Sequence, residues 1–396
     1  MERIRLAVVG MGHRGLSLAK QHQQLKECKV VAICDRIKPL VEKAYKELAD
    51  PDIKCYTNFN EMLERKDIDA VAIYTFPTTQ IDLVCKALQA GKHTCCEVPL
   101  TFSIEDCWKV VLTVEKTGLK FQLQEQTRYL PHILAWKKMV EEGALGKIVF
   151  AEGQYIGFYN FVYNFWNPKT GEYPGFEYAR KNPNKVKKTW REYMQHPIYY
   201  LPHELSPLLS ILNDRVVKVS AMGTQKEKSY VTPETNRADI EVALMQTKKD
   251  TVMRLAAGFN IPRGVPHHWY HLLGTKGTVE TKRSDLDEDM MWLSDLHMEA
   301  PAKVSWGWKH SPIPKEALES GHSGADYYPM ANFIKSIIED TIPALDVYRA
   351  VETAAPAILA AKSIEEGSIC LEVPDFRPGK KRAKSQENFG HSLPSL

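Results

Sequence analysis

The chain has 396 residues, of which 44% are hydrophobic and 26% charged, and its formal net charge at pH 7 is +3. This length exceeds what one compact core usually holds, so two domains are expected. The composition is that of a globular protein, and the charge lacks the positive excess of a nucleic-acid-binding protein. No window approaches the run of about eighteen apolar residues that spans a bilayer. We therefore expect neither nucleic-acid nor membrane partners.

The N-terminal residues 1–10 run almost directly into an apolar strand, without the charged and apolar regions or the cleavage site of a signal peptide. The eight cysteines show neither CxxC spacing nor a nearby histidine pattern suited to zinc. These observations predict a cytoplasmic protein with reduced, mostly packed thiols and no metal site.

The first third of the chain alternates β-branched runs with helical patterns. In chain order the pattern predicts a strand over 4–10, a helix near 14–26, a strand over 29–35, a helix near 37–49, a strand over 69–75, a helix near 79–90, a strand over 93–98, a helix near 103–117 and a strand over 120–124. This βαβ order predicts an α/β Rossmann domain, a doubly wound parallel sheet that covers residues 1–123.

Longer alternating segments follow, at 147–158, 216–225, 238–248, 251–259 and 269–282. They predict an α+β domain over 124–376 with a large open mixed or antiparallel sheet. Residues 164–195, rich in proline, asparagine, lysine and aromatics, are too long for a simple connection and predict a binding loop or lid. Helices near 328–340 and 346–366 return the chain, and the polar tail 377–396 is expected to be disordered.

A glycine-rich turn stands between the first strand and the first helix. Gly10, Gly12 and Gly15 form a Gly-x-Gly-x-x-Gly run, in which the glycines permit a tight turn, a close backbone approach to pyrophosphate, and close helix packing. The helix N-terminus offers free amides to the anion. Asp35 ends the second strand, where its carboxylate can accept hydrogen bonds from ribose hydroxyls and so favours NAD. Arg36 could instead receive a 2′-phosphate, which keeps NADP as an alternative.

Several further segments, in their order, resemble the Gfo/Idh/MocA oxidoreductases, which join a Rossmann domain to an α+β domain. They are MGHRG, AIYTFP, GKHTCCEVP, GALGKI, LLGTKG and the histidine His203 at a helix start. Typical sugar dehydrogenases of that superfamily carry Glu-Lys-Pro, whereas this chain has Glu97, Val98 and Pro99. Because valine cannot hold a proton, and because Tyr199 replaces the usual aspartate, the chain is a poor match to those dehydrogenases.

The chain is most similar to glycoside hydrolase family 109, in which Glu-Val-Pro is normal. Glu125, Gln126 and Tyr129 match its Glu-Asn-x-x-Tyr apart from the amide. Tyr155 stands where that family has its active-site tyrosine, and YYLPHELSP preserves a Tyr-x-x-His-x-x-x-Pro pattern. The segments GHSGADY, LDVYRA and VPDFRPG continue the likeness.

The resemblance implies a glycosidase with a retained NAD, an exception to the paired-carboxylate mechanism. Oxidation at carbon 3 of the sugar acidifies the hydrogen on carbon 2, the aglycone leaves by elimination, water adds, and the same cofactor restores the alcohol. His203 would handle the proton of the carbon 3 hydroxyl or of the departing oxygen, and Tyr155 would remove the carbon 2 proton. Tyr200, one turn before His203, would share their pocket, and Glu125 would lie at the ligand edge of the Rossmann sheet.

Further residues are expected at the same site. We assign to the cofactor His13, Arg14, Thr75, Glu97, Pro99 and Gln126, and to the substrate Tyr129, Trp190 and Arg191. The aromatic side chains of 164–195 are either a sugar platform or a small satellite core. His267, His268 and His271 are interpreted as structural, because adjacent residues of a strand face opposite sides.

Two other functions stay open on the sequence. One is a sugar or cyclitol dehydrogenase with net NAD(P) reduction, and the other is a non-catalytic NAD-binding sensor. By analogy with the superfamily, we expect a homodimer or homotetramer.

Overall fold

The computed structural model describes residues 3–157, 164–232, 235–259, 261–262, 267–307, 314–379, 381–382 and 384–385, except for the side chains of Glu192 and Tyr193. The described chain forms two compact units. The first combines 1–125, 161–193 and 314–351, and the second combines 126–160, 194–313 and 352–396. The division into 1–123, 124–376 and 377–396 stays a prediction, and most of the last segment lies outside the described residues.

A parallel sheet of six strands forms the centre of the first unit, in the order β3-β2-β1-β4-β5-β6. Its strands are β1 (Ile4–Val9), β2 (Cys28–Cys34), β3 (Lys54–Tyr56), β4 (Ala70–Ile73), β5 (His93–Cys96) and β6 (Phe121–Leu123). The strand order reverses between β1 and β4, which is the point where an open α/β sheet binds its ligand. The predicted Rossmann sheet is therefore confirmed. The sequence pattern missed β3, whose three residues are too few and too polar to show a strand period.

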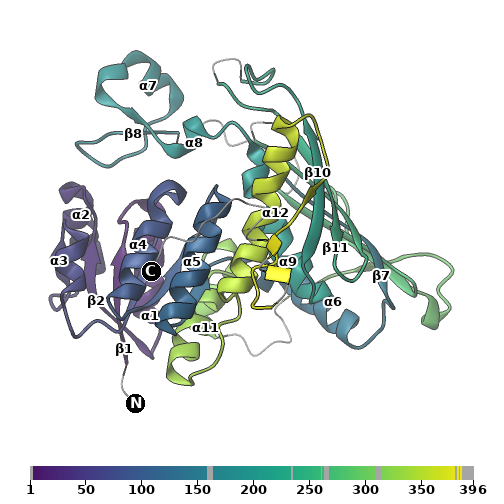
Figure 1. Ribbon diagram of the computed structural model, residues 1–396, viewed down its shortest axis with the longest axis horizontal. Coiled ribbons are helices and arrows are strands. Elements are labelled where there is room, and N and C mark those ends of the chain that lie inside the picture. Colours follow the sequence, from purple (N-terminus) through teal and green to yellow (C-terminus); the bar gives the residue numbers. More distant parts are fainter. Residues whose placement is uncertain are drawn as a thin grey trace. The chain divides into compact units, whose positions relative to one another are not determined.

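The helices of the first unit pack beside this sheet (Figure 1). They are α1 (His13–Gln24), α2 (Lys38–Leu48), α3 (Phe59–Leu63), α4 (Pro77–Gln89), α5 (Ile104–Thr117) and α11 (Tyr327–Ile338), and the short α10 (Lys315–Leu318) contacts α11. The segment predicted as a loop or lid instead contains short elements: β8 (Phe165–Trp166), α7 (Phe176–Lys181), the 3-10 helix η2 (Pro183–Lys185), β9 (Lys187–Lys188) and α8 (Trp190–Tyr193). The long α12 (Val347–Glu365) contains the point in the chain, after residue 351, where the first unit ends and the second resumes.

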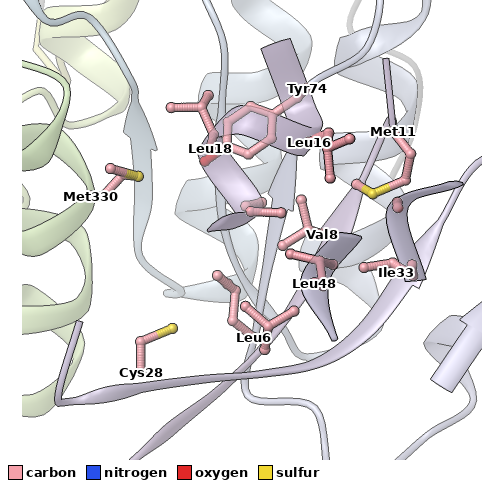
Figure 2. Packing of buried hydrophobic residues seen from close by; sticks show 14 of the residues in the cluster. Leu6, Val8, Met11, Leu16, Leu18, Cys28, Ile33, Leu48, Tyr74 and Met330 are labelled. Atoms are coloured by element: carbon pink, nitrogen blue, oxygen red, sulfur yellow. The ribbon is translucent and has the colours of Figure 1, made fainter. Parts of the chain in front are cut away.

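One hydrophobic cluster joins distant parts of the chain in the first unit. Leu6 and Val8 of β1 are fully buried against Leu16 and Leu18 of α1, as alternation along a buried strand requires. Helix α11 adds Met330, which Figure 2 shows beside these residues. The cluster holds the first strand and the first helix rigidly, and these two elements carry the glycine-rich turn.

A mixed sheet of nine strands forms the second unit, in the order β16-β15-β14-β13-β7-β12-β11-β10-β17. Its strands are β7 (Ile148–Gly157), β10 (Val216–Gly223), β11 (Glu241–Thr247), β12 (Val252–Phe259), β13 (His268–Gly274), β14 (Gly277–Glu280), β15 (Asp289–Leu293), β16 (Ala302–Val304) and β17 (Leu371–Glu372). The pair β7 and β12 is parallel and the other neighbours are antiparallel. The predicted large mixed sheet is confirmed.

Helices cover part of this sheet (Figure 1). They include α6 (Pro131–Glu141) and α9 (Pro202–Leu212). The second unit also contains the 3-10 helices η1 (Thr127–Tyr129), η3 (Pro197–Tyr200) and η4 (Ser294–Leu296). Helix α9 packs on strand β7 and on α6. Among the described residues, no helix is both long and apolar enough to cross a membrane.

Candidate functional site

The glycine-rich turn between β1 and α1 is tightly enclosed. Gly10 has a φ of +91°, and a Cβ there would lie 2.3 Å from the carbonyl oxygen of Tyr74. A Cβ on Gly15 would lie 1.8 Å from the Gly10 carbonyl oxygen. The N-cap of α1 is Gly12, which has no side chain to cap the helix, so amides of the first turn can donate to an anion.

A cavity of about 290 Å³ opens beside this turn, entirely within the first unit. The predicted cofactor residues that line it are Gly10, Gly12, Asp35, Arg36 and Thr75. Its other walls are largely apolar: Val9, Ile37, Leu40, Phe59, Phe76, Leu83, Trp166 and Tyr173. An apolar cavity with a few polar groups beside a helix N-terminus suits a dinucleotide.

Asp35 connects the end of β2 to the glycine turn. Its Oδ2 accepts the Met11 N–H at 2.7 Å, and its Oδ1 accepts the Ile37 N–H at 2.9 Å. Burial raises the pKa of Asp35, although these hydrogen bonds and the charge of Arg36 oppose the shift. Both the carboxylate and the exposed Arg36 line the cavity, so its wall offers a partner for a free ribose and another for a 2′-phosphate.

The segment from Trp166 to Tyr173 closes one side of the same cavity. A Cβ on Gly171 would lie 2.2 Å from Cδ2 of Leu40, so the segment contacts helix α2 directly. A Cβ on Gly12 would lie 3.1 Å from the Tyr173 hydroxyl. The sequence indicated a binding role for this region, but no pattern showed that these two aromatics line the cofactor cavity.

Arg14 is the centre of an ion network in the first unit. Its Nε lies 2.6 Å from Oε1 of Glu97, and its Nη1 and Nη2 lie 2.6 and 3.0 Å from the two carboxylate oxygens of Asp326. His322 Nδ1 lies 2.9 Å from the same aspartate. Burial alone would raise the pKa of Asp326, but the hydrogen bonds from His322 and Arg14 outweigh it and hold that pKa well below its usual range. Arg14 thus fixes the helix start to Glu97.

The Glu97-Val98-Pro99 turn is held by a buried amide. Gln80 Nε2 lies 2.7 Å from the Glu97 carbonyl oxygen and 3.2 Å from that of Pro99. In the described part of the chain, Glu97 Oε2 and Thr75 Oγ1 are buried without a hydrogen-bond partner. Buried polar atoms are normally satisfied, so both atoms are available to a polar ligand such as the nicotinamide half of a dinucleotide. The residues present therefore fit NAD.

In the second unit, the predicted proton-handling residues form one aromatic cluster. The Tyr155 ring on β7 lies 5.3 Å from the His203 ring and 5.8 Å from the Tyr200 ring, measured between centroids. Tyr200 and His203 stack at 5.9 Å. His203 and Tyr200 are buried, whereas Tyr155 is half-buried and so partly open to a ligand. The structure brings together three of the residues that the sequence singled out.

Proline explains how the backbone of His203 is held. In a regular helix the N–H of residue 207 would donate to the His203 carbonyl, but Pro207 has none. That carbonyl instead accepts the Thr127 hydroxyl at 2.6 Å and the Tyr270 hydroxyl at 3.0 Å. The spacing His-x-x-x-Pro therefore frees an acceptor that two side chains use to anchor the first turn of α9.

Comparison with known proteins identifies the chain. Residues 4–125 match the family described as "Oxidoreductase family, NAD-binding Rossmann fold", and residues 129–383 match "Glycosyl hydrolase 109, C-terminal domain". The chain belongs to glycoside hydrolase family 109. The predicted resemblance is confirmed.

Individual relatives cover nearly the whole chain. "Glycosyl hydrolase family 109 protein 2" of Phocaeicola vulgatus is 27% identical, over 95% of each chain. An "Alpha-N-acetylgalactosaminidase" of Bacteroides fragilis is 29% identical, over 95% of this chain and 92% of its own. The solved scyllo-inositol dehydrogenase of Lactobacillus casei, with bound NAD(H) and scyllo-inositol, is 19% identical with a TM-score of 0.69 over 94% of this chain and 99% of its own. That likeness shows the fold alone.

The remaining predicted site residues of this family 109 protein are distributed over both units. In the first unit, Glu125 is fully buried just after β6, and His13 is exposed at the start of α1. The Trp190 ring lies 5.6 Å from Phe102, and the Arg191 guanidinium lies 5.2 Å from the Trp190 ring centroid. In the second unit, Gln126 precedes η1 and Tyr129 is buried. Their functional roles stay predictions.

Burial characterises most cysteines of this family 109 protein, and contacts with carboxylates hold two of the histidines in the His267–His271 region. Six of the eight cysteines are buried, and burial raises the pKa of Cys96 well above its ordinary value. His271 bonds Glu152, and His268 bonds Glu204, a residue that the sequence did not single out. In the part of the chain that the structure describes, no group of three or more His, Cys, Asp or Glu side chains could hold a metal ion.

Proposed function

We propose that this protein is a glycosidase that uses one bound NAD as a redox catalyst and releases no NADH. The observation that carries the proposal is the ring contact between Tyr155 and His203, because it joins two proton-transferring side chains in the domain that defines the family. Val98 supports it further, since a valine in this turn supplies no proton.

NAD, when bound, would accept a hydride from carbon 3 of the sugar and return it at the end of the cycle. The glycine turn and the helix N-terminus would hold the pyrophosphate, and Thr75 and Glu97 offer buried polar atoms to the rest of the cofactor. Asp35 favours NAD, and NADP is the alternative because Arg36 lines the same cavity. Mass spectrometry of the nucleotide released by denaturation decides between them.

The chain's own residues would move the protons. Tyr155 takes the proton from carbon 2 and so allows the aglycone to leave by elimination. His203 holds the proton of the carbon 3 hydroxyl or gives one to the departing oxygen, for which an imidazole is well suited near neutral pH. Tyr200 stacks on His203 and keeps the imidazole ring in place. The buried Glu125 is a further proposed catalytic residue, at the ligand edge of the Rossmann sheet.

The name of one relative supports a proposed substrate class. The Bacteroides fragilis relative is named an α-N-acetylgalactosaminidase, so an α-linked N-acetylgalactosaminide is the first glycoside to test. Tyr129, Trp190 and Arg191 are the proposed substrate contacts. A guanidinium stacked on an indole face presents a planar donor set that suits sugar hydroxyls.

A panel of nitrophenyl glycosides tests this function. The proposal expects release of nitrophenol without accumulation of NADH. Accumulation of NADH in proportion to consumed sugar would instead establish a sugar or cyclitol dehydrogenase, which the fold also accommodates. Bound NAD with no turnover on any glycoside, sugar or cyclitol would indicate a sensor. The predicted homodimer or homotetramer is a matter for light scattering, and the cytoplasmic location for cell fractionation.

A further inference from the structure

A carboxylate–imidazole pair lies beside the Tyr155–His203 cluster and has no part in the mechanism above. Oε1 of Glu204 lies 2.7 Å from Nδ1 of His268, and the Glu204 side chain is fully buried. We propose that Glu204 and His268 are a positioning pair, which holds a protonated imidazole ring flat on Tyr155 and so favours the phenolate form of that tyrosine. This inference rests on the proposed function, in which Tyr155 takes a proton.

The sheet register explains why the two rings meet. His268 on β13 is the antiparallel partner of Tyr155 on β7, so both side chains stand on the same face. Their rings are parallel, with centroids 4.6 Å apart and an interplanar angle of 3°. Tyr155 therefore has an imidazole stacked parallel to one face of its ring.

A glycine explains how Glu204 reaches the histidine. Gly153 lies two residues before Tyr155 and shares its face of the sheet. A Cβ at Gly153 would lie 3.0 Å from both Cβ and Cγ of Glu204. Because that space is free, helix α9 packs closely on β7 and its glutamate extends to His268 on the next strand.

Burial explains the protonation state of the pair. A fully buried carboxylate is costly unless a cation or a strong donor compensates it, and His268 is the donor that the structure provides to Oε1. A protonated ring makes the pair neutral overall. Its positive charge beside the phenol favours the phenolate, since an opposite charge at about 4–6 Å stabilises the charged form of a group. The imidazole keeps its proton while Tyr155 alternates between phenolate and phenol.

In the described part of the chain, other titratable side chains face the same cluster from η3, α6, α9, β13 and the residue just before β13: Tyr200, His132, His203, Tyr270 and His267. Burial, together with the smaller effect of the charge of His268, lowers the pKa of His132 to about 3, so His132 is neutral under ordinary conditions. Tyr270 donates its hydroxyl to the His203 carbonyl.

Strands β7 and β13 carry a second carboxylate–imidazole pair, which serves as a control. Glu152 and His271 are cross-strand partners, as Tyr155 and His268 are, and Oε2 of Glu152 lies 3.1 Å from Nδ1 of His271. Because neighbouring residues of a strand alternate, this pair stands on the opposite face of the sheet from Tyr155. Glu152→Gln therefore removes a carboxylate from the same strands without touching the cluster.

The test is a titration of Tyr155 in the full-length protein with its cofactor. The tyrosinate absorbance of each variant is compared with that of the same variant carrying Tyr155→Phe, so the difference reports Tyr155. Glu204→Gln and His268→Gln are expected to raise the midpoint, which is the pH at which half of Tyr155 is ionised, by about one pH unit or more. His268→Arg restores a planar cation and returns the midpoint toward the wild-type value, and Glu152→Gln leaves it unchanged.

A midpoint that stays unchanged in both Glu204→Gln and His268→Gln overturns the inference, as does an equal shift in Glu152→Gln. Two variants of the pair are used in case one fails to fold. A second measurement tests the proposed function separately: whether the wild-type protein exchanges the carbon 2 hydrogen of the sugar with solvent. If the wild type shows no exchange but the midpoint responds, the proposed function fails and the pair stands. If exchange occurs and the midpoint does not respond, the pair alone fails.

Discussion

Pro207 stands one helical turn after His203 and has no N–H to give to the His203 carbonyl oxygen. The Thr127 hydroxyl takes that place at 2.6 Å. Thr127→Val should therefore cost about 1–2 kcal/mol of unfolding free energy, because it leaves a buried acceptor with one donor fewer. It should also lower kcat with little change in KM, since His203 loses its anchor. Urea unfolding and glycoside kinetics measure both effects.

A second substitution checks the cause. Pro207→Ala supplies the missing helical N–H, so the double variant Thr127→Val/Pro207→Ala should recover part of the lost kcat. Equal turnover in wild type and Thr127→Val would show that the carbonyl contact does not position His203.

The Arg14 network predicts an effect on stability. Arg14→Ala leaves the carboxylates of Glu97 and Asp326 close together without their cation, and the Asp326 side chain is only 1% exposed. Loss of one partner of such a buried pair costs roughly 3–5 kcal/mol, measured by urea unfolding. Lys20→Ala breaks only the exposed contact to Glu47 and should change stability by about 0.5 kcal/mol or less. Similar values for the two variants would contradict the account.

The same network predicts a pH dependence. The folded-state pKa of Asp326 is lowered below its unfolded value, so its contribution is complete above the unfolded value of about 3.9 and is lost as pH falls through the folded value. Asp326→Asn should therefore lose less stability than the wild type on acidification below about pH 4. Unfolding free energies measured from neutral to acidic pH test this, and parallel acid profiles would refute it.

The segment from Trp166 to Tyr173 should retain the cofactor. Trp166→Ala and Tyr173→Ala open a wall of the cavity, so NAD should dissociate at least about tenfold faster, as loss of one well-packed aromatic contact implies. Stopped-flow release into a NAD-consuming trap measures the rate. Tyr178→Ala, a substitution of an exposed tyrosine in α7, is the control. Unchanged release from both variants would exclude a retaining role.

Asp35 and Arg36 predict the choice of nucleotide. Asp35→Ser removes the charge that repels a 2′-phosphate and keeps the arginine, so the ratio of NADP to NAD affinity should rise by about tenfold or more. Adding Arg36→Ala should reverse most of the gain. Calorimetric titration of both nucleotides gives the ratio, and an unchanged ratio in Asp35→Ser would place the ribose elsewhere.

Local patterns in the sequence predicted much of this molecule. Strand β1 was recognisable as a continuous apolar run because it is buried on both faces. The glycine turn was recognisable because close contacts at Gly10 and Gly15 leave no room for a side chain. The cluster of Tyr155, Tyr200 and His203 was recognisable because two of its members share one short motif. Pro207 belongs to the same motif, but only the helix geometry explains its effect, which is to leave the His203 carbonyl free for side-chain donors.

Other features depend on contacts that no local pattern encodes. Arg14 and Asp326 are 312 residues apart in the chain and meet because α11 packs on the first strand. Glu204 and His268 meet through the register of β7 with β13 and the gap at Gly153, so His268 looked merely structural in the sequence. The lining of the cofactor cavity by Trp166 and Tyr173 likewise follows from where a long segment packs.

The central claim is that the sugar is oxidised and reduced within one turnover. Its most direct test is cleavage of a nitrophenyl α-N-acetylgalactosaminide in deuterated water, with mass spectrometry and NMR of the released sugar. The account predicts deuterium at carbon 2 of the product, no net NADH, and loss of both cleavage and exchange in Tyr155→Phe. Cleavage with hydrogen fully retained at carbon 2 would contradict it.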